Sequence, residues 1–505
     1  MDPVIRMTSP SYRRWMTAGL AAAVTAGLAA RGWRLGLNGL SSDEALSWRL
    51  TRYGLGDMIR RAAEDVHPPL YGLVLKAWLA AWGDAPEALR GLSVLFGVAV
   101  IPLAVLLVRE AAVLDPPALA ARIRAGAGLA GILVALHATQ VVQSRNARMY
   151  AMGMALAMAS AYLLLRARRA VRARWAWWAA WGVAAAAAIG AHYYLLFTVA
   201  AQAAWALVPR RGERTPIREI VAAGAVALLL FAPWLPVFWQ QTRRVQAAYS
   251  LGPPTASSLA QAVARWATGV EVAEGAPLLA ALALLSLVAA LRVGRAGRFL
   301  AAQAAAPWVL GLGVSLVSGR PLILERYMVF GQAFLVCAWV VAVAAIDRGA
   351  VRAAAAAALV VAVGWGLIAT VRAYPEQPPA LAAAARFLKR TARGDLVVVD
   401  SPRALNKLRY YAGQADAEDL DIRCALPESK PLTRYVSHEV SLAPGDVVPR
   451  DSVFTSSATT VWRGRESTAP PDPAPPGWAI TYVRMLDGGE GTHFGLVRYQ
   501  RADAP

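Results

Sequence analysis

The chain is poor in charged residues and in cysteine, and its low charge argues against a soluble protein. Only 17% of its 505 residues are charged and 57% are hydrophobic, whereas a soluble chain of this length would show several domains with alternating polar faces. The two cysteines, Cys337 and Cys424, lie in different regions, and Cys337 stands inside an apolar run. A disulfide between them is therefore not expected, and they give no information on the redox compartment.

Acidic residues are scarce in the first three quarters of the chain. Residues 376–505 carry 16 basic and 16 acidic side chains, so the net charge of +20 belongs entirely to residues 1–375. There the basic residues separate apolar segments instead of gathering on one soluble face. This pattern argues against a nucleic-acid partner and favours a protein that lies in a lipid bilayer.

Eleven apolar segments, each long enough to cross a bilayer, predict a polytopic helical membrane protein. The first is nearer twenty residues than the 7–15 of a signal peptide, so we expect a retained anchor. The segments lie at about 14–34, 88–108, 125–142, 149–165, 175–191, 193–208, 218–236, 276–291, 299–317, 327–346 and 351–371.

The loops that join these segments alternate in charge. Loop 166–174 has five arginines and loop 209–218 has four, and the basic set to which they belong holds 20 of the 36 basic residues before position 376. The positive-inside rule places this set and the N-terminus in the cytoplasm. Residues 35–87 are then external, as is everything after the last segment. We expect a multi-pass protein of the cell (inner) membrane.

Residues 376–505 predict a small extracytoplasmic α/β domain that follows a transmembrane domain at 1–375. No metal motif, nucleophile elbow or phosphate-binding loop stands in this second domain. The fold class is therefore an all-α polytopic membrane protein, with interfacial helices over about 55–84 in the first external loop and a small C-terminal α/β domain. Periodicity and flanking charges predict helices over 381–393 and 404–412, and strands over 395–400, 452–455, 479–485 and 494–500.

The first external loop contains Ser41-Ser42-Asp43-Glu44 before Ala-Leu-Ser-Trp. Such a sequence is a good helix N-terminus, in which Ser or Asp caps free amides. An acidic pair at a membrane surface is also costly to desolvate, and partial desolvation raises a carboxyl pKa as a general base requires. Spacing alone leaves the cap and the base open, and the two are compatible.

Two further motifs on the predicted external side carry side chains that could bind a substrate. The prolines after His67 present its imidazole at the rigid start of a helix, although a plain helix start explains them too. Arg145 and Arg148, three residues apart, would lie on one helix face and bind a phosphate, or extend to lipid headgroups. Because arginine is disfavoured on the external side, we favour the phosphate.

Other candidates stand where later segments meet the external side. His192-Tyr193-Tyr194 follows one segment, and an aromatic belt would explain its tyrosines. Arg320 and Arg326 lie in the loop between the segments at 299–317 and 327–346 and are harder to explain in that way. They add to a cationic cluster on the outer face.

Five motifs in this order resemble one family. They are the acidic pair, His-Pro-Pro-Leu-Tyr at 67–71, Ala-Arg-Met-Tyr-Ala at 147–151, His-Tyr-Tyr at 192–194 and Arg-Tyr at 326–327. Together they resemble the bacterial polyprenyl-phosphate-sugar-dependent glycosyltransferases of the GT-C fold. This family is related to the protein O-mannosyltransferases, the lipid A aminoarabinose transferases and the lipopolysaccharide-core galacturonosyl and mannosyl transferases. The resemblance covers about residues 10–375, and the C-terminal domain matches only in position and general type.

The resemblance implies a sugar donor on a polyprenyl phosphate and an acceptor hydroxyl on an envelope lipid, glycan or protein. Asp43 would be the base of an inverting in-line attack, and Glu44 would orient the sugar or the acceptor. Stabilising the leaving group is commonly the largest catalytic contribution. The departing phosphate would be neutralised by four arginines: Arg145, Arg148, Arg320 and Arg326. The rest of the substrate site would be formed by His67, Tyr150, His192 and Tyr193.

One departure from the family concerns a metal. Related sequences have an acidic residue where this chain has Asn146, so a divalent metal is an alternative that the missing charge disfavours, and no other cofactor is implied. Two other functions stay open: a transporter or flippase of lipid-linked sugars, and a catalytically silent envelope scaffold. Transporters often show internal repeats and mid-membrane charges. This chain shows no repeat, and its candidate residues gather at one surface.

Overall fold

A computed structural model divides the chain into two compact units. The helical unit comprises Met1–Trp33, His67–Tyr71 and Arg90–Tyr374; the sheet unit comprises Arg34–Val66, Gly72–Leu89 and Pro375–Pro505. The grouping of residues 34–66 and 72–89 with the C-terminal residues was not expected from the sequence, and the domain boundary at 375 stays a prediction. The structure describes residues 10–209, 215–248, 255–270, 275–318, 323, 325–373, 380–392, 394–426, 447–449, 453, 460–465, 472–487 and 493–502.

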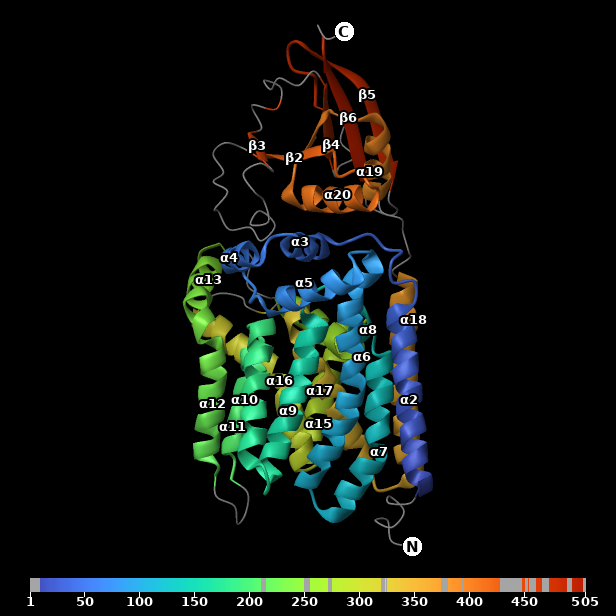
Figure 1. Ribbon diagram of the computed structural model, residues 1–505. Coiled ribbons are helices and arrows are strands. Elements are labelled where there is room, and N and C mark those ends of the chain that lie inside the picture. The colour runs from blue at the N-terminus through green and yellow to red at the C-terminus, as the bar shows by residue number, and fades with distance from the viewer. Residues whose placement is uncertain are drawn as a thin grey trace. The chain divides into compact units, whose positions relative to one another are not determined.

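Helices occupy all eleven predicted segments, and in Figure 1 they run side by side as a bundle. Among the described residues, seven helices are long and apolar enough to cross a membrane: α6, α7, α9, α12 continued by α13, α16, α17 and α18. The predicted polytopic helical architecture is confirmed. The eleven helices are α2 (Pro10–Gly32), α6 (Pro86–Ala111), α7 (Pro117–Leu136), α9 (Tyr150–Arg169), α10 (Arg174–Ala191), α11 (Leu195–Leu207), α12 (Ile217–Phe231), α15 (Ala276–Arg292), α16 (Arg295–Ser318), α17 (Glu325–Ala344) and α18 (Gly349–Ala373).

Shorter helices connect the long ones and correct one prediction. The segment predicted at 125–142 is not one helix, because His137 has an extended backbone and separates α7 from α8 (Ala138–Ser144). The His137 side chain is fully buried, and its Nε2 lies 2.9 Å from the carbonyl of Ala267 in α14 (Ala256–Thr268). Burial lowers the pKa of His137 to about 4. The ring is therefore neutral and donates from Nε2, which ties the α7–α8 junction to α14.

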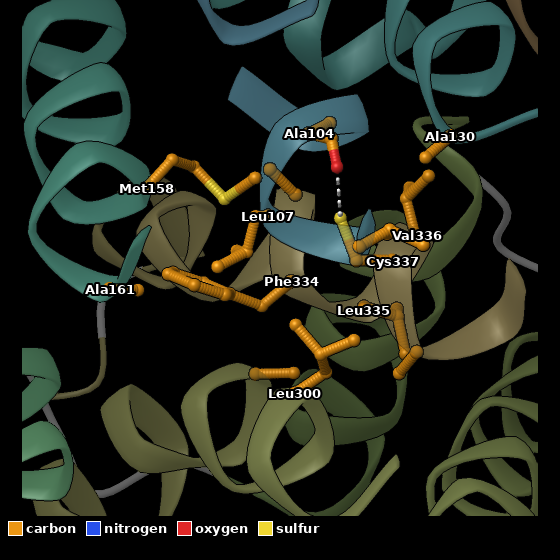
Figure 2. Packing of buried hydrophobic residues seen from close by; sticks show 14 of the residues in the cluster. Ala104, Leu107, Ala130, Met158, Ala161, Leu300, Phe334, Leu335, Val336 and Cys337 are labelled. Atoms are coloured by element: carbon orange, nitrogen blue, oxygen red, sulfur yellow. Dashed lines mark hydrogen bonds between the residues drawn. The ribbon is translucent and has the colours of Figure 1, made fainter. Parts of the chain in front are cut away.

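Small residues allow the long helices to approach closely. A Cβ atom on Gly331 of α17 would lie 2.4 Å from the carbonyl oxygen of Ala304 in α16, and one on Gly182 would lie 2.5 Å from that of Ala223. Such contacts are typical of helix packing in membranes, where backbones meet without bulky side chains between them. Figure 2 shows the core that results, with the buried thiol of Cys337 4.0 Å from the carbonyl of Ala104.

The sheet unit contains a six-stranded mixed sheet with the order β3-β2-β1-β4-β6-β5. Strands β1 to β4 pair in parallel, whereas β6 is antiparallel to both β4 and β5. All four side chains of β1 are buried, as expected for a central strand covered on both faces. The elements are α19 (Ala380–Thr391), β1 (Leu396–Val399), α20 (Pro402–Gln414), β2 (Asp421–Leu426), β3 (Val447–Pro449), β4 (Thr460–Arg465), β5 (Trp478–Asp487) and β6 (His493–Arg501).

The predicted helices and three of the predicted strands match α19, α20, β1, β5 and β6, so a small α/β domain is confirmed. The strand predicted at 452–455 is not observed at Val453, which lies in a turn, and its other residues lie outside the described part. Strands β2, β3 and β4 were not predicted. The segment between α2 and α6 adds three helices: α3 (Ser42–Thr51), α4 (Leu55–Glu64) and α5 (Leu70–Trp82).

Candidate active site

The acidic pair stands in the first turn of α3, which begins with a capping box. The hydroxyl of Ser41 accepts a hydrogen bond from the amide of Glu44 at 3.2 Å, and Glu44 Oε2 accepts one from the amide of Ser41 at 2.9 Å. This reciprocal pair satisfies two backbone donors that a helix start leaves open. The predicted helix start is confirmed, and the capping residues are Ser41 and Glu44.

The two carboxylates of the acidic pair, Asp43 and Glu44, differ in their part in the capping box. Glu44 is only 3% exposed, and one of its oxygens holds the backbone of Ser41. Asp43 is half-buried and is not part of the capping box. Its backbone carbonyl accepts from the hydroxyl of Ser47 one turn later, at 3.0 Å. The capping box thus accounts for the carboxylate of Glu44 and does not involve that of Asp43.

The C-terminal end of α3 is fixed by a lysine. Lys76 of α5 donates from Nζ to the carbonyls of Thr51 and Tyr53, at 2.7 and 2.8 Å. A cation at this end of a helix satisfies carbonyls without intrahelical partners and interacts favourably with the helix dipole. Both ends of the helix that carries Asp43 are therefore defined by side chains.

A separate set of predicted residues converges on His192 in the helical unit. This residue ends α10 in an extended conformation and is 4% exposed. The ring centroids of His67 and Tyr150 lie 5.6 and 6.1 Å from its own. The structure thus brings together three residues that the sequence analysis placed in one substrate site, from motifs that span more than 120 residues of the chain.

The hydrogen bonding of His192 determines where its proton lies. Burial, followed by the charges of His67, Arg148 and Arg326, holds the pKa of His192 well below its usual value, so the ring is neutral. Its Nδ1 accepts from the amide of Tyr194 at 3.1 Å, so the hydrogen of the neutral ring is on Nε2. Among the described residues, Nε2 has no hydrogen-bond partner. An unpaired buried donor costs about 1–3 kcal/mol, which a ligand oxygen would offset.

Two hydroxyl groups connect the His-Pro-Pro-Leu-Tyr motif at 67–71 to Arg148 of the Ala-Arg-Met-Tyr-Ala motif. The hydroxyl of Tyr71 lies 3.2 Å from Ser93 Oγ, which donates to the carbonyl of Arg148, also at 3.2 Å. Tyr71 and Arg148 are 5% and 7% exposed. The residues 67–71 are thereby fixed against the loop that positions Arg148.

The prediction that Arg145 and Arg148 share a helix face is wrong, because α8 ends at Ser144 and α9 begins only at Tyr150. The arginines lie in the intervening turn. Arg145 donates from Nη1 to the carbonyls of Arg31 and Trp33, at 3.2 and 2.6 Å, where α2 ends. A cation there stabilises the helix end. Arg145 therefore has a structural role, while Arg148 is buried near His192.

The other residues predicted for the substrate site are Tyr193, Arg326 and Arg320. The hydroxyl of Tyr193 accepts from Trp234 Nε1 at 2.7 Å and donates to Gln241, so it fixes the start of α13 (Leu235–Ala248). Arg326 is exposed at the start of α17, with its guanidinium 5.6 Å from the ring centroid of Tyr327. Arg320 lies outside the described residues.

Solved structures of membrane proteins share this architecture. ArnT from Cupriavidus metallidurans in the apo state matches 96% of this chain and 98% of its own, with a TM-score of 0.64 and 13% sequence identity. The same protein bound to undecaprenyl phosphate gives a TM-score of 0.58 over the same shares, also at 13% identity. The oligosaccharyltransferase AglB from Archaeoglobus fulgidus, in complex with an inhibitory peptide and a dolichol-phosphate, matches 90% of this chain and 70% of its own, with a TM-score of 0.52 and 11% identity.

The chain has the GT-C fold. No protein-family model matches it, and no curated protein matches it in sequence. At 11–13% identity the likeness to solved structures shows the fold alone. The GT-C fold expected from the five sequence motifs is confirmed.

Within this GT-C fold, three aromatic residues near His192 were not predicted as site residues. The ring centroids of Tyr327, Phe330 and Tyr194 lie 4.6, 5.0 and 6.2 Å from that of His192. Both tyrosines stand inside the His-Tyr-Tyr and Arg-Tyr motifs, so the sequence held a signal for them. Phe330 lies three residues after Tyr327 on α17 and carried none.

A buried carboxylate was also missed. Asp65 ends α4, is 5% exposed, and precedes His67 by two residues. Among the residues that the structure describes, no group of three or more His, Cys, Asp or Glu side chains could hold a metal ion.

Proposed function

We propose that the protein is a membrane glycosyltransferase, which moves a sugar from a polyprenyl-phosphate donor to a hydroxyl group of an envelope lipid, glycan or protein at the outer face of the membrane. The convergence of His67, Tyr150 and His192 carries this proposal, because it builds a buried donor without a partner from three of the family motifs. Solved proteins with the same fold, ArnT and AglB, are described in complex with undecaprenyl phosphate and dolichol-phosphate.

In the proposed reaction the acceptor hydroxyl attacks the anomeric carbon from the side opposite the phosphate. Asp43 takes the hydroxyl proton as the new carbon–oxygen bond forms, and the bond to the phosphate oxygen breaks with its electron pair. The polyprenyl phosphate leaves as an anion, so no general acid is needed. The configuration at the anomeric carbon is inverted.

The positive groups near His192 suit the leaving phosphate. Arg148 and Arg326 lie close enough to lower the pKa of His192, so their charge acts at this place. In the proposal they offset the charge that develops on the phosphate, and His192 donates from Nε2 to a phosphate oxygen. Asp43 acts on the acceptor. Orientation of the sugar or acceptor by Glu44 and phosphate contacts of Arg145, Arg320 and Tyr193 stay predictions.

The Asp43→Asn variant tests the proposal. Transfer from a radiolabelled polyprenyl-phosphate sugar by the purified protein in liposomes should fall about 10²–10⁴-fold, because the amide cannot accept the proton. Asp57→Asn is the matched control, since Asp57 is an exposed acid on α4 that pairs with Arg60 three residues later. That variant should keep the wild-type rate.

Two outcomes would contradict the proposal. Wild-type transfer by Asp43→Asn would exclude Asp43 as the base. Absence of transfer by the wild type, together with movement of a fluorescent donor analogue across the bilayer, would identify a transporter. If the wild type transfers sugar, mass spectrometry of envelope glycans from a deletion strain should show which sugar is missing.

A further inference from the structure

Two adjacent tyrosines of α20 contact the helix that carries Asp43, and both helices belong to the sheet unit (Figure 1). The hydroxyl of Tyr411 accepts a hydrogen bond from the amide of Leu40 at 2.7 Å. Leu40 directly precedes the N-cap Ser41, so this bond fixes the backbone where the chain enters α3. Tyr411 is 7% exposed, which shields the bond from water.

Tyr410 contacts the other half of α3. Its ring meets that of Trp48 edge to face, with centroids 5.2 Å apart and an interplanar angle of 85°. Its hydroxyl donates to the carbonyl of Asp84 at 3.1 Å, and Trp48 Nε1 donates to the carboxylate of the same residue at 3.0 Å. The three residues form a closed set in which each contacts the other two. Tyr410 is fully buried, and this geometry is favourable for an aromatic pair.

The α20 helix is itself firmly attached to the sheet. It begins with a cap in which Ser401 Oγ accepts from the amide of Ala404 at 3.1 Å. Arg409 donates to the carbonyl of Ile422 in β2, and α20 also packs against α19 and β1. The tyrosines therefore extend from a rigid element, whereas α3 has only ten residues. Helices of that length are marginal alone, so tertiary contacts determine where α3 lies.

We propose that Tyr410 and Tyr411 are positioning residues, which hold α3 so that the Asp43 carboxylate meets the acceptor hydroxyl in the reactive geometry. This proposal rests on the proposed function of Asp43. It gives two C-terminal residues a part in catalysis, although neither tyrosine is a reacting group. A general base displaced by about 1 Å loses up to about 10²-fold in rate, so small shifts of α3 have measurable consequences.

Tyrosine-to-phenylalanine variants test the two contacts separately. Tyr411→Phe removes the acceptor for the Leu40 amide and keeps the ring. We expect kcat to fall about tenfold and the donor KM to stay within twofold, because the base is displaced but the donor site is untouched. The variant Tyr410→Phe/Tyr411→Phe should lose about 10²-fold in kcat.

Tyr499→Phe is the matched control. The Tyr499 hydroxyl also donates to a backbone carbonyl, that of Asp472 at 2.9 Å, and its ring is 1% exposed in β6 of the same unit. This bond ties β6 to Asp472 and not to the start of α3, so kcat should stay at the wild-type value even if the unfolding temperature falls as much as in Tyr411→Phe. A purely structural role of Tyr411 would affect both variants equally.

Hydrogen–deuterium exchange of the full-length protein supplies a readout that does not depend on activity. Amides of residues 40–51 should exchange faster in Tyr411→Phe and at the wild-type rate in Tyr499→Phe. Unchanged exchange, or faster exchange with wild-type kcat, would overturn the positioning role, as would a higher donor KM at unchanged kcat. Absence of transfer by the wild type would overturn the proposed function instead, while exchange would still decide whether α20 orders α3.

Discussion

The helical unit and the sheet unit each hold candidate site residues, and the surroundings of these residues are built in different ways. In the helical unit, His192 is enclosed by rings from α9, α11 and α17 and their flanking loops, so long helices in close packing define its place. In the sheet unit, Asp43 stands on a ten-residue helix whose ends depend on a capping box, a lysine and two tyrosines. We infer that the His192 cluster is robust in geometry and sensitive to its chemical groups, whereas Asp43 is sensitive to distant contacts.

Among single substitutions, the largest effect after Asp43→Asn is expected at His192. His192→Phe keeps a ring of similar size but removes the Nε2 donor, and kcat/KM for the donor should fall about 10- to 100-fold. His137→Phe is the control, because His137 is also buried and neutral but its Nε2 already contacts Ala267. That variant should lose stability while its folded fraction keeps its donor KM. Equal kinetic losses in both would refute a direct role for His192.

Much of the architecture could be predicted because lipid imposes simple rules. A spanning segment must satisfy its backbone internally, so each long apolar run had to be a helix. The break at His137 was missed because the apolar run continues through it. Strands β2 to β4 were missed because short parallel strands lack the alternation that marks an exposed antiparallel strand.

The candidate site residues were predictable only where the local sequence contains a recognisable motif or spacing. The cap of Ser41 and Glu44 follows from their spacing, and the sequence motifs pointed to His67, Tyr150 and His192. The role of Arg145 could not be predicted, since it depends on the carbonyls of a helix end more than 110 residues earlier in the chain. The contacts of Tyr410 and Tyr411 were equally hidden, because their partners are more than 320 residues away.

A smaller effect is expected from the capping box. Ser41→Ala removes the acceptor for the Glu44 amide and should cost about 1 kcal/mol of helix stability, because one backbone donor loses its partner. Fraying of the first turn would displace Asp43, so kcat should fall about fivefold. Ser42→Ala is the control, since Ser42 is not part of the capping box. Identical kcat in the two variants would show that the cap does not position the acidic pair.

The last effect concerns stability and not the rate of transfer, and it involves the two buried histidines. Burial lowers the pKa of His137 to about 4 and that of His192 well below the ordinary value near 6.5. The unfolded chain therefore binds more protons than the folded chain below pH 6.5. Stability is complete above that pH and declines as pH falls, by at most about 1.4 kcal/mol per pH unit for each histidine.

The apparent unfolding temperature of the detergent-solubilised protein checks this expectation at pH 7.5 and pH 5. It should decrease with pH, and the decrease should be smaller in His137→Phe/His192→Phe, which lacks both titrating groups. The contribution of His137 to this decline ends at about pH 4, because below its folded-state pKa the folded and the unfolded chain both bind the proton. An equal decrease in the double variant would show that other groups carry the acid sensitivity. A donor that binds His192 Nε2 should raise the unfolding temperature at both pH values, because a ligand bound only to the folded state stabilises it.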